Sequence, residues 1–248
     1  MNLFKTQKLG GQALNKIAEL ALSSQLEAAD SLEVKIDTAP EKLANGELES
    51  LLIEGKGLVL DTDLRVEVLE IDMNAISVRP LKALAGKIEL TKPTTGTARL
   101  VLTETDLNLA LNSPDLRAKI EVLDTYLSTG QITLTVPQKR CQFREDGTIA
   151  VEAVVELQPS GETKEVAFSA TPKIAAGGSN VLLEDIQYEV GKEMSEELTQ
   201  AFQDKAAKML DLRNFEKQGL ALRINQLTVE AGQITLLAVA DITKFPTL

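Results

Sequence analysis

The residues of this chain that could do chemistry are acidic side chains and a single thiol. The sequence contains 37 acidic residues, one cysteine and no histidine. The doublets Asp61/Asp63 and Glu70/Asp72 have a spacing at which carboxylates could hydrolyse a glycosidic bond or bind calcium. Such doublets arise by chance in so acidic a chain, and Asp61-Thr62-Asp63 also reads as a turn. We therefore expect these pairs to be solvated surface.

The thiol of Cys141 lies in the segment Lys-Arg-Cys-Gln-Phe-Arg, where flanking cations favour a lowered pKa. A nucleophilic cysteine also needs a base, and the lack of histidine excludes Ser-His-Asp and Cys-His sites. We expect a free structural thiol here. The segment Gly55-Lys56-Gly57 lacks the third glycine of a dinucleotide-binding loop and predicts a bulge or twist within a strand. The sequence thus predicts a protein that is not an enzyme and has no cofactor or metal.

The composition favours a binding domain. Hydrophobic residues make up 44% of the chain but aromatic residues only 3%, so Leu, Val, Ile and Ala dominate. These side chains build either a plain aliphatic core or flexible walls that suit acyl chains. The net charge of −11 and the pI near 4.7 argue against nucleic acid as a partner.

Charge is distributed unevenly along the chain. Residues 27–72 hold 13 acidic side chains against four basic ones, whereas residues 79–99 hold five basic side chains against Glu89. The cations of the second stretch are candidate contacts for lipid head groups or an anionic membrane surface, and a solvated face is the alternative. They are Arg79, Lys82, Lys87, Lys92 and Arg99.

The N-terminal segment predicts an amphipathic helix over residues 9–26. Its apolar stripe is formed by Leu9, Ala13, Ile17, Leu20 and Ser24, widened by Leu14, Ala18 and Leu22. Lys5, Lys8 and Lys16 would suit a helix on a membrane surface, whereas packing on the domain is the expected role of the stripe. This segment has no continuous apolar h-region and no cleavage site. We therefore expect a cytoplasmic protein, or one peripheral to an internal membrane, unless a leader has been removed.

Two strand-rich stretches separated by helices predict an α+β fold with antiparallel strands. The predicted strands are 32–36, 48–60, 64–78, 87–90 and 97–102, then 131–136, 148–157, 164–171, 181–190, 220–229 and 233–241. Within 64–78 the apolar alternation changes phase twice, which predicts β-bulges and a long, strongly curved sheet. Gly-Gln-Ile-Thr-Leu recurs at Gly130 and Gly232. We expect one domain over 1–248, in which 1–129 and 130–248 could be pseudo-repeated halves.

Three further helices are predicted in the middle and late parts of the chain. Thr103 begins a capping box with Asp106, Ser113-Pro114 begins a helix that runs to Leu127, and residues 194–212 form the third. The apolar residues of the first two helices are candidate contacts for acyl chains, with a sealed core as the equal alternative. They are Leu107, Leu111, Leu116, Ile120, Leu123 and Leu127.

Four segments carry a resemblance to a known family. These are Ser31–Ser50, Ile53–Leu58, Leu84–Leu90 and Leu102–Pro114, and the word Leu-Thr-Glu-Thr-Asp-Leu-Asn in the last is the most specific. They resemble the LmeA-like phospholipid-binding family of bacteria, in its cyanobacterial branch, over about the first half of the chain. The resemblance implies a tubular lipid-binding (TULIP) fold, in which a long curved antiparallel sheet wraps around a helix and leaves an apolar groove. It also implies binding or transfer of phospholipid at a membrane.

Three functions follow from these observations. The first is non-enzymatic binding of phospholipid or another acyl lipid in an apolar groove, with peripheral membrane contact. The second is a protein-interaction or assembly module on the same scaffold, with a filled core and no lipid. The third is a hydrolase that uses carboxylates alone, for which Asp61 and Asp63 are the leading candidates.

Overall fold

The computed structural model describes residues 3–24, 26–59, 64–79, 89–114, 122–127, 130–158, 160–213, 216 and 219–244. It confirms the α+β class with antiparallel strands. The described helices with defined bounds are α1 (Leu3–Ser23), α2 (Pro40–Ala44), α4 (Glu104–Asn112) and α6 (Glu196–Met209).

The described strands form two antiparallel sheets rather than one long sheet. The first has the order β1-β2-β3-β4-β11-β10, and its strands are β1 (Ser31–Asp37), β2 (Glu47–Val59), β3 (Arg65–Ser77), β4 (Thr94–Thr103), β10 (Leu220–Glu230) and β11 (Gln233–Ile242). The second has the order β5-β6-β7-β8-β9, and its strands are β5 (Val122–Leu127), β6 (Gly130–Phe143), β7 (Ile149–Gln158), β8 (Glu162–Ile174) and β9 (Val181–Tyr188). Both sheets are open at their edges.

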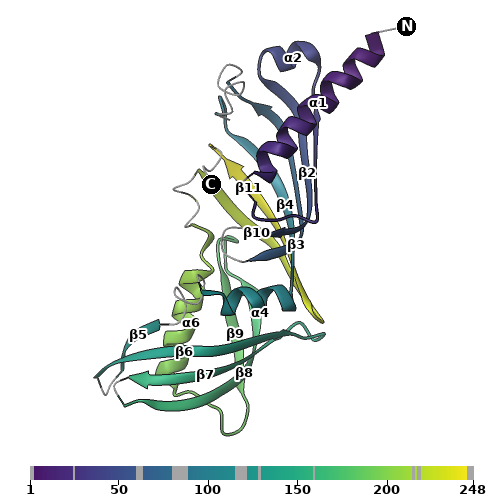
Figure 1. The fold of residues 1–248 in the computed structure, drawn as a ribbon. Helices are drawn as coiled ribbons and strands as arrows, with labels where there is room; N and C mark the ends of the chain where they lie inside the picture. The colour runs from purple at the N-terminus through teal and green to yellow at the C-terminus, as the bar shows by residue number, and fades with distance from the viewer. Residues whose placement is uncertain are drawn as a thin grey trace.

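The two sheets meet at α4, which lies between them in Figure 1. Leu107 and Leu111 of α4 pack against a small core made by Cys141 and Phe143 of β6 and Val229 of β10. The N-cap of the predicted capping box is present, since the Thr103 hydroxyl accepts a hydrogen bond from the Asp106 backbone N–H at 3.1 Å. The Asp106 carboxylate accepts a hydrogen bond from the same hydroxyl at 2.6 Å. The local sequence signal and the tertiary position of α4 therefore agree.

The five-stranded sheet has its own core, which α6 covers. Phe168 is 4% exposed and lies at the centre of this core, with its ring centroid 5.3 Å from that of Phe202 on α6. The Tyr188 ring also meets Phe168 edge to face, and its hydroxyl lies 2.7 Å from the Thr199 hydroxyl of α6. The predicted helix over 194–212 is thus confirmed as α6, with its apolar face on the sheet.

The helix predicted to run from Ser113-Pro114 to Leu127 is wrong in its second half. Residues 122–127 form strand β5, which pairs with β6 and places Leu123 in register with Leu134. A four-residue spacing keeps two side chains on one face of a helix and also on one face of a strand. The spacing of Leu123 and Leu127 therefore does not distinguish a helix from a strand. Val122, Thr125 and Tyr126 favour a strand. Residues 115–121, including Leu116 and Ile120, lie outside the described residues.

The two phase changes predicted in 64–78 have different outcomes in the structure. Ala75 has a φ of 54°, and Asn74 and Ala75 are both exposed, so the alternation does reset there. Between Val68 and Leu69 the register with β2 and β4 continues unbroken, so the bulge predicted at that point is absent. Val66 is buried, and it lies in register with Leu58 of β2, which is buried too. Register shifts occur instead where β6 pairs with β7, β8 with β9 and β10 with β11.

Candidate lipid-contacting surfaces

The most distinctive surface of the molecule is one face of the six-stranded sheet. The pairing register places three rows of residues across all six strands, and every member of each row is apolar. We call this the aliphatic face. Its rows are Leu32-Gly55-Leu69-Leu100-Leu236-Leu227, Val34-Ile53-Ile71-Ala98-Ala238-Ile224 and Ile36-Leu51-Met73-Gly96-Ala240-Leu222.

The opposite face of the same strands is mostly polar and charged. Its rows are Glu33-Glu54-Glu70-Arg99-Leu237-Gln226 and Lys35-Leu52-Asp72-Thr97-Val239-Arg223. Ion pairs hold this face together, such as Lys35 Nζ to Glu54 Oε2 at 2.6 Å and Arg99 Nη1 to Glu70 Oε1 at 3.3 Å. The sheet thus separates apolar from charged side chains according to strand alternation.

Helices pack on this sheet at its margins. α1 lies against the edge strand β1, α2 contacts β2, and α4 contacts β3 and β4. At the α4 end, Arg65 Nη1 lies 3.1 Å from the buried Asp106 Oδ2, and Asp30 and Glu67 also pair with Arg65. These carboxylates raise the pKa of the Arg65 guanidinium, first through its hydrogen bond to Glu67. This ion cluster bounds the aliphatic face on the side of α4.

Burial across the aliphatic face is uneven. Val34 and Met73 are almost fully buried, at 1% and 2% exposure. The central residues Ile53, Leu69, Leu100, Ala98 and Ala238 are only half-buried, and so is Leu236 on β11. Because the small side chains of Ala98 and Ala238 pair directly with each other, the middle of the face is a shallow depression surrounded by larger side chains.

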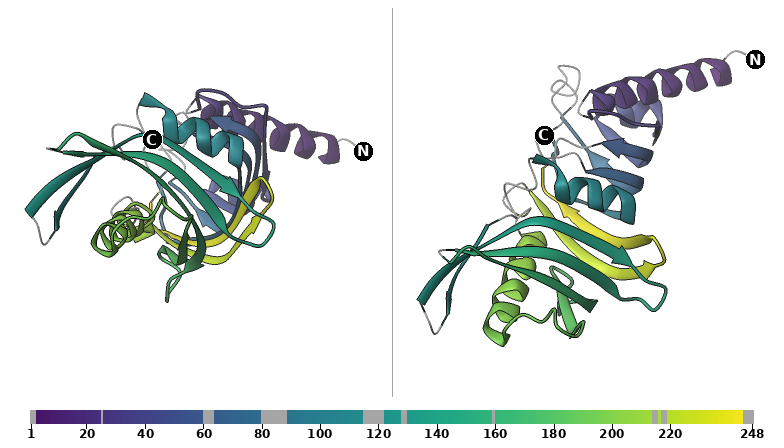
Figure 2. Two further views of the ribbon diagram at one scale, coloured as in Figure 1. Left: turned by 90° about the horizontal axis from the view of Figure 1, so that it is seen from below. Right: turned by 60° about the horizontal axis from the view of Figure 1, so that its bottom comes forward.

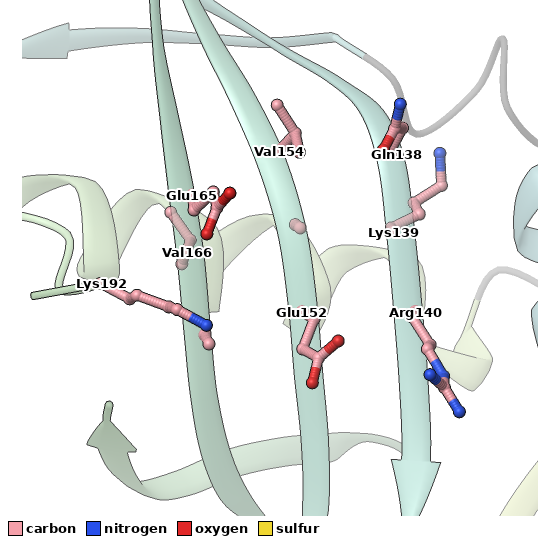
Figure 3. Close-up of a pocket in the computed structure, with 10 residues that line it drawn as sticks. Gln138, Lys139, Arg140, Glu152, Val154, Glu165, Val166 and Lys192 are labelled. Atoms are coloured by element: carbon pink, nitrogen blue, oxygen red, sulfur yellow. The ribbon is translucent and has the colours of Figure 1, made fainter. Parts of the chain in front are cut away.

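Two hollows in the surface have linings that mix charged and apolar side chains. One, of about 610 Å³, lies over the charged face of the six-stranded sheet and is lined by Arg99, Glu54, Glu70 and Asp72 together with the apolar Leu52, Leu237 and Val239. The other, of about 360 Å³, lies on β6, β7 and β8 and is lined by Arg140, Glu152, Glu165 and Lys192 among others. Figure 3 shows Arg140, Glu152 and Glu165 on the three strands, with Lys192 reaching in beside them. Because charged side chains line both hollows, they suit acyl chains less well than the aliphatic face does.

The structure disperses the predicted acyl contacts instead of placing them on one helix face. Leu107 and Leu111 are half-buried at the α4 junction. Leu123 and Leu127 are in β5, where their side chains are outside the described part, and Leu116 and Ile120 are not described at all. The aliphatic face was missed as a unit, although the alternation of β2, β3 and β11 carried the signal for each strand separately.

The predicted head-group cations also separate. Arg79 follows β3 and pairs with Glu89 at 2.8 Å, and the exposed Lys92 precedes β4, so both lie at the end of the sheet opposite α4. Arg99 lies on the charged face and pairs with Glu70. Lys82 and Lys87 lie outside the described residues.

The acidic and thiol candidates show no catalytic arrangement where they are described. Cys141 is a free, buried cysteine, which confirms the expected structural thiol. Burial raises the pKa of this thiol to about 12, with a smaller effect from Glu104, so the flanking cations do not lower it. The reason is that Cys141 points into the core at α4. Glu70 is engaged by Arg99, and Asp61 and Asp63 fall outside the described residues. Among the described residues, no group of three His, Cys, Asp or Glu could hold a metal ion.

Gly57 adopts a φ of 58° within β2, which confirms that Gly55-Lys56-Gly57 is a local twist in a strand. None of the described helices combines the length and apolar character needed to cross a bilayer.

The structure is that of an antiparallel α+β protein with one broad aliphatic face. The family model of LmeA-like phospholipid-binding proteins matches residues 6–239, and the chain belongs to that family. The match extends well beyond the first half of the chain, where the sequence segments carried the resemblance. No curated protein and no solved structure gives a significant match.

Proposed function

We propose that this protein binds a phospholipid without catalysing a reaction, and that the acyl chains lie on the aliphatic face of the six-stranded sheet. The observation that carries the proposal is the set of three unbroken apolar rows, whose centre is only half-buried. Apolar surface of this kind gains free energy when an acyl chain removes it from water. Membership of a phospholipid-binding family supports the same ligand.

The two ends of the aliphatic face suggest an orientation for the lipid. Leu107 and Leu111 of α4 would contact the acyl chains at the end of the face next to α4, where the Arg65 ion cluster bounds the face. Arg79 and Lys92 would meet the phosphate at the other end. Arg99 is a weaker candidate because three carboxylates share its hollow. A TULIP-like wrap of this sheet around the lipid, and delivery of the lipid at a membrane, extend the same proposal.

The proposal is tested with protein purified without detergent and analysed by native mass spectrometry. We expect phospholipid to be released from the wild-type protein. Ala98→Phe fills the low centre of the aliphatic face and should reduce the bound phospholipid several-fold. Thr97→Phe is the matched control, because the neighbouring side chain lies on the charged face of the same strand and is exposed.

A wild-type protein that carries no phospholipid, and acquires none from vesicles, would contradict the proposal. So would equal lipid loss in both variants. Thermal unfolding of each variant distinguishes a face that binds lipid from a face that is a sealed core. If Ala98→Phe lowers Tm strongly without changing lipid content, the aliphatic face is a sealed core.

A further inference from the structure

Helix α1 presents an apolar stripe that nothing in the described structure covers. Ile17 and Leu20 are 64% and 62% exposed, and Ala13 and Ala21 beside them are also exposed. The stripe was predicted to pack on the domain, and for these residues that prediction is wrong. Where burial is described, the half-buried apolar residues of this helix are Leu14, Ala18 and Leu22, on the side that faces β1.

The outward direction of the stripe is set by hydrogen bonds to the edge strand. The Asn15 side-chain oxygen accepts from the Ile36 backbone N–H at 3.0 Å, and Glu19 Oε1 accepts from the Val34 N–H at 3.4 Å. These contacts satisfy donors that an edge strand would otherwise leave open. Because Asn15 and Glu19 face the strand, Ile17 and Leu20 must face away from it. Figure 2 shows α1 projecting beyond the sheet, with its N-terminus outermost.

The charge of this helix differs from that of the rest of the chain. Lys5, Lys8 and Lys16 are the charged residues before Glu19, whereas the whole chain has a net charge of −11. The Lys16 side chain is 69% exposed and lies beside the stripe, where it pairs with Glu19 at 2.8 Å. A helix with exposed aliphatic residues and flanking lysines is complementary to an anionic lipid surface. A second copy of this chain is a poorer occupant, because two molecules that each carry a net charge of −11 repel each other.

We propose that the α1 stripe docks on the surface of an anionic lipid bilayer, with Ile17 and Leu20 in the acyl boundary and Lys16 at the level of the phosphates. The inference rests on the proposed function, since a protein that takes up phospholipid from a bilayer must first reach it. The hydrogen bonds of Asn15 and Glu19 keep α1 attached to β1 during docking. The six-stranded sheet is therefore the part of the protein held next to the bilayer.

The test is flotation of the full chain with two kinds of vesicle, phosphatidylcholine alone and phosphatidylcholine mixed equally with phosphatidylglycerol. We expect binding to the mixed vesicles that weakens as salt is added, and little binding to the neutral ones. Replacing both Ile17→Ser and Leu20→Ser should abolish binding, and Lys16→Glu should reduce it several-fold. Leu109→Ser on α4 is the matched control, because Leu109 is an equally exposed leucine, at 66%, on another helix.

Unchanged flotation of the double variant, or equal loss with Leu109→Ser, would overturn the proposal. Self-association of the wild-type protein that the double variant abolishes would also overturn it, by making a second copy the occupant. Circular dichroism confirms that the double variant keeps its helices. Lipid content keeps the two proposals apart: docking predicts that the double variant retains its phospholipid, whereas lipid-free wild-type protein that still floats would refute only the proposed function.

Discussion

In the five-stranded sheet, α6 lies over the apolar face and contributes Leu198 and Phe202 to a core built around Phe168. The strands of the six-stranded sheet contain no aromatic residue, and the helices that contact it do so at its margins. Its central side chains are half-buried. A face sealed by large, interlocked rings needs no further partner, whereas a broad face of small and branched aliphatic side chains leaves surface that a flexible chain can cover. The comparison therefore shows one sheet whose apolar face is covered by its own helix and one whose broad apolar face is covered less completely.

The largest effect should come from the sealed core. Phe168→Ala removes a nearly fully buried ring that meets both Tyr188 and Phe202, and should lower the free energy of unfolding by about 3 to 5 kcal/mol. Leu100→Ala on the aliphatic face removes a half-buried side chain and should cost about 1 kcal/mol. Urea denaturation of lipid-free protein measures both values. Equal costs would show that the two faces are packed alike and would remove the contrast.

An intermediate effect is expected at the junction between the sheets. Asp106 caps α4 together with Thr103 and pairs with Arg65, and it is buried. Asp106→Ala should therefore cost about 2 kcal/mol, since it removes the cap interaction and leaves the Arg65 guanidinium without its buried partner. Glu67→Ala removes a more exposed partner of the same arginine and should change stability by about 0.5 kcal/mol or less. If urea titrations show that Glu67→Ala costs more stability than Asp106→Ala, then the buried Asp106 is not the main partner of Arg65 at this junction.

The smallest effect concerns pH and the same junction. Burial raises the pKa of Cys141 from 9.0 to about 12, so folding favours the neutral thiol. Its contribution to stability is fully present below pH 9 and is lost as the pH rises towards 12, because the unfolded chain then releases the proton more readily. Urea titrations at pH 8 and pH 10 should show a larger fall for the wild-type protein than for Cys141→Ala. Parallel falls in the two proteins would contradict this assignment.

Several elements followed directly from local sequence. The Thr103-Asp106 capping box predicted α4, the apolar spacing of residues 194–212 predicted α6, and alternation predicted most strands of both sheets. Local spacing was insufficient at Leu123 and Leu127, because intervals of four residues suit a helix and a strand equally. At Val66 and Val68 the local spacing suggested a bulge that is absent. Apolar residues change phase there because β3 buries side chains of both faces at different points along its length.

The sequence by itself determined which residues of each strand share a face, because alternation along an extended backbone is a property of the chain alone. It also determined the aliphatic, aromatic-poor character of the first sheet and the lysines of α1. Only the tertiary structure decided that β4 pairs with β11, which joins Ala98 to Ala238 across 140 residues and completes the aliphatic face. It likewise decided that α6 covers one sheet while α1 lies at the edge of the other with Ile17 and Leu20 exposed. These pairings are long-range, and no short segment of sequence carries the packing energy that selects them.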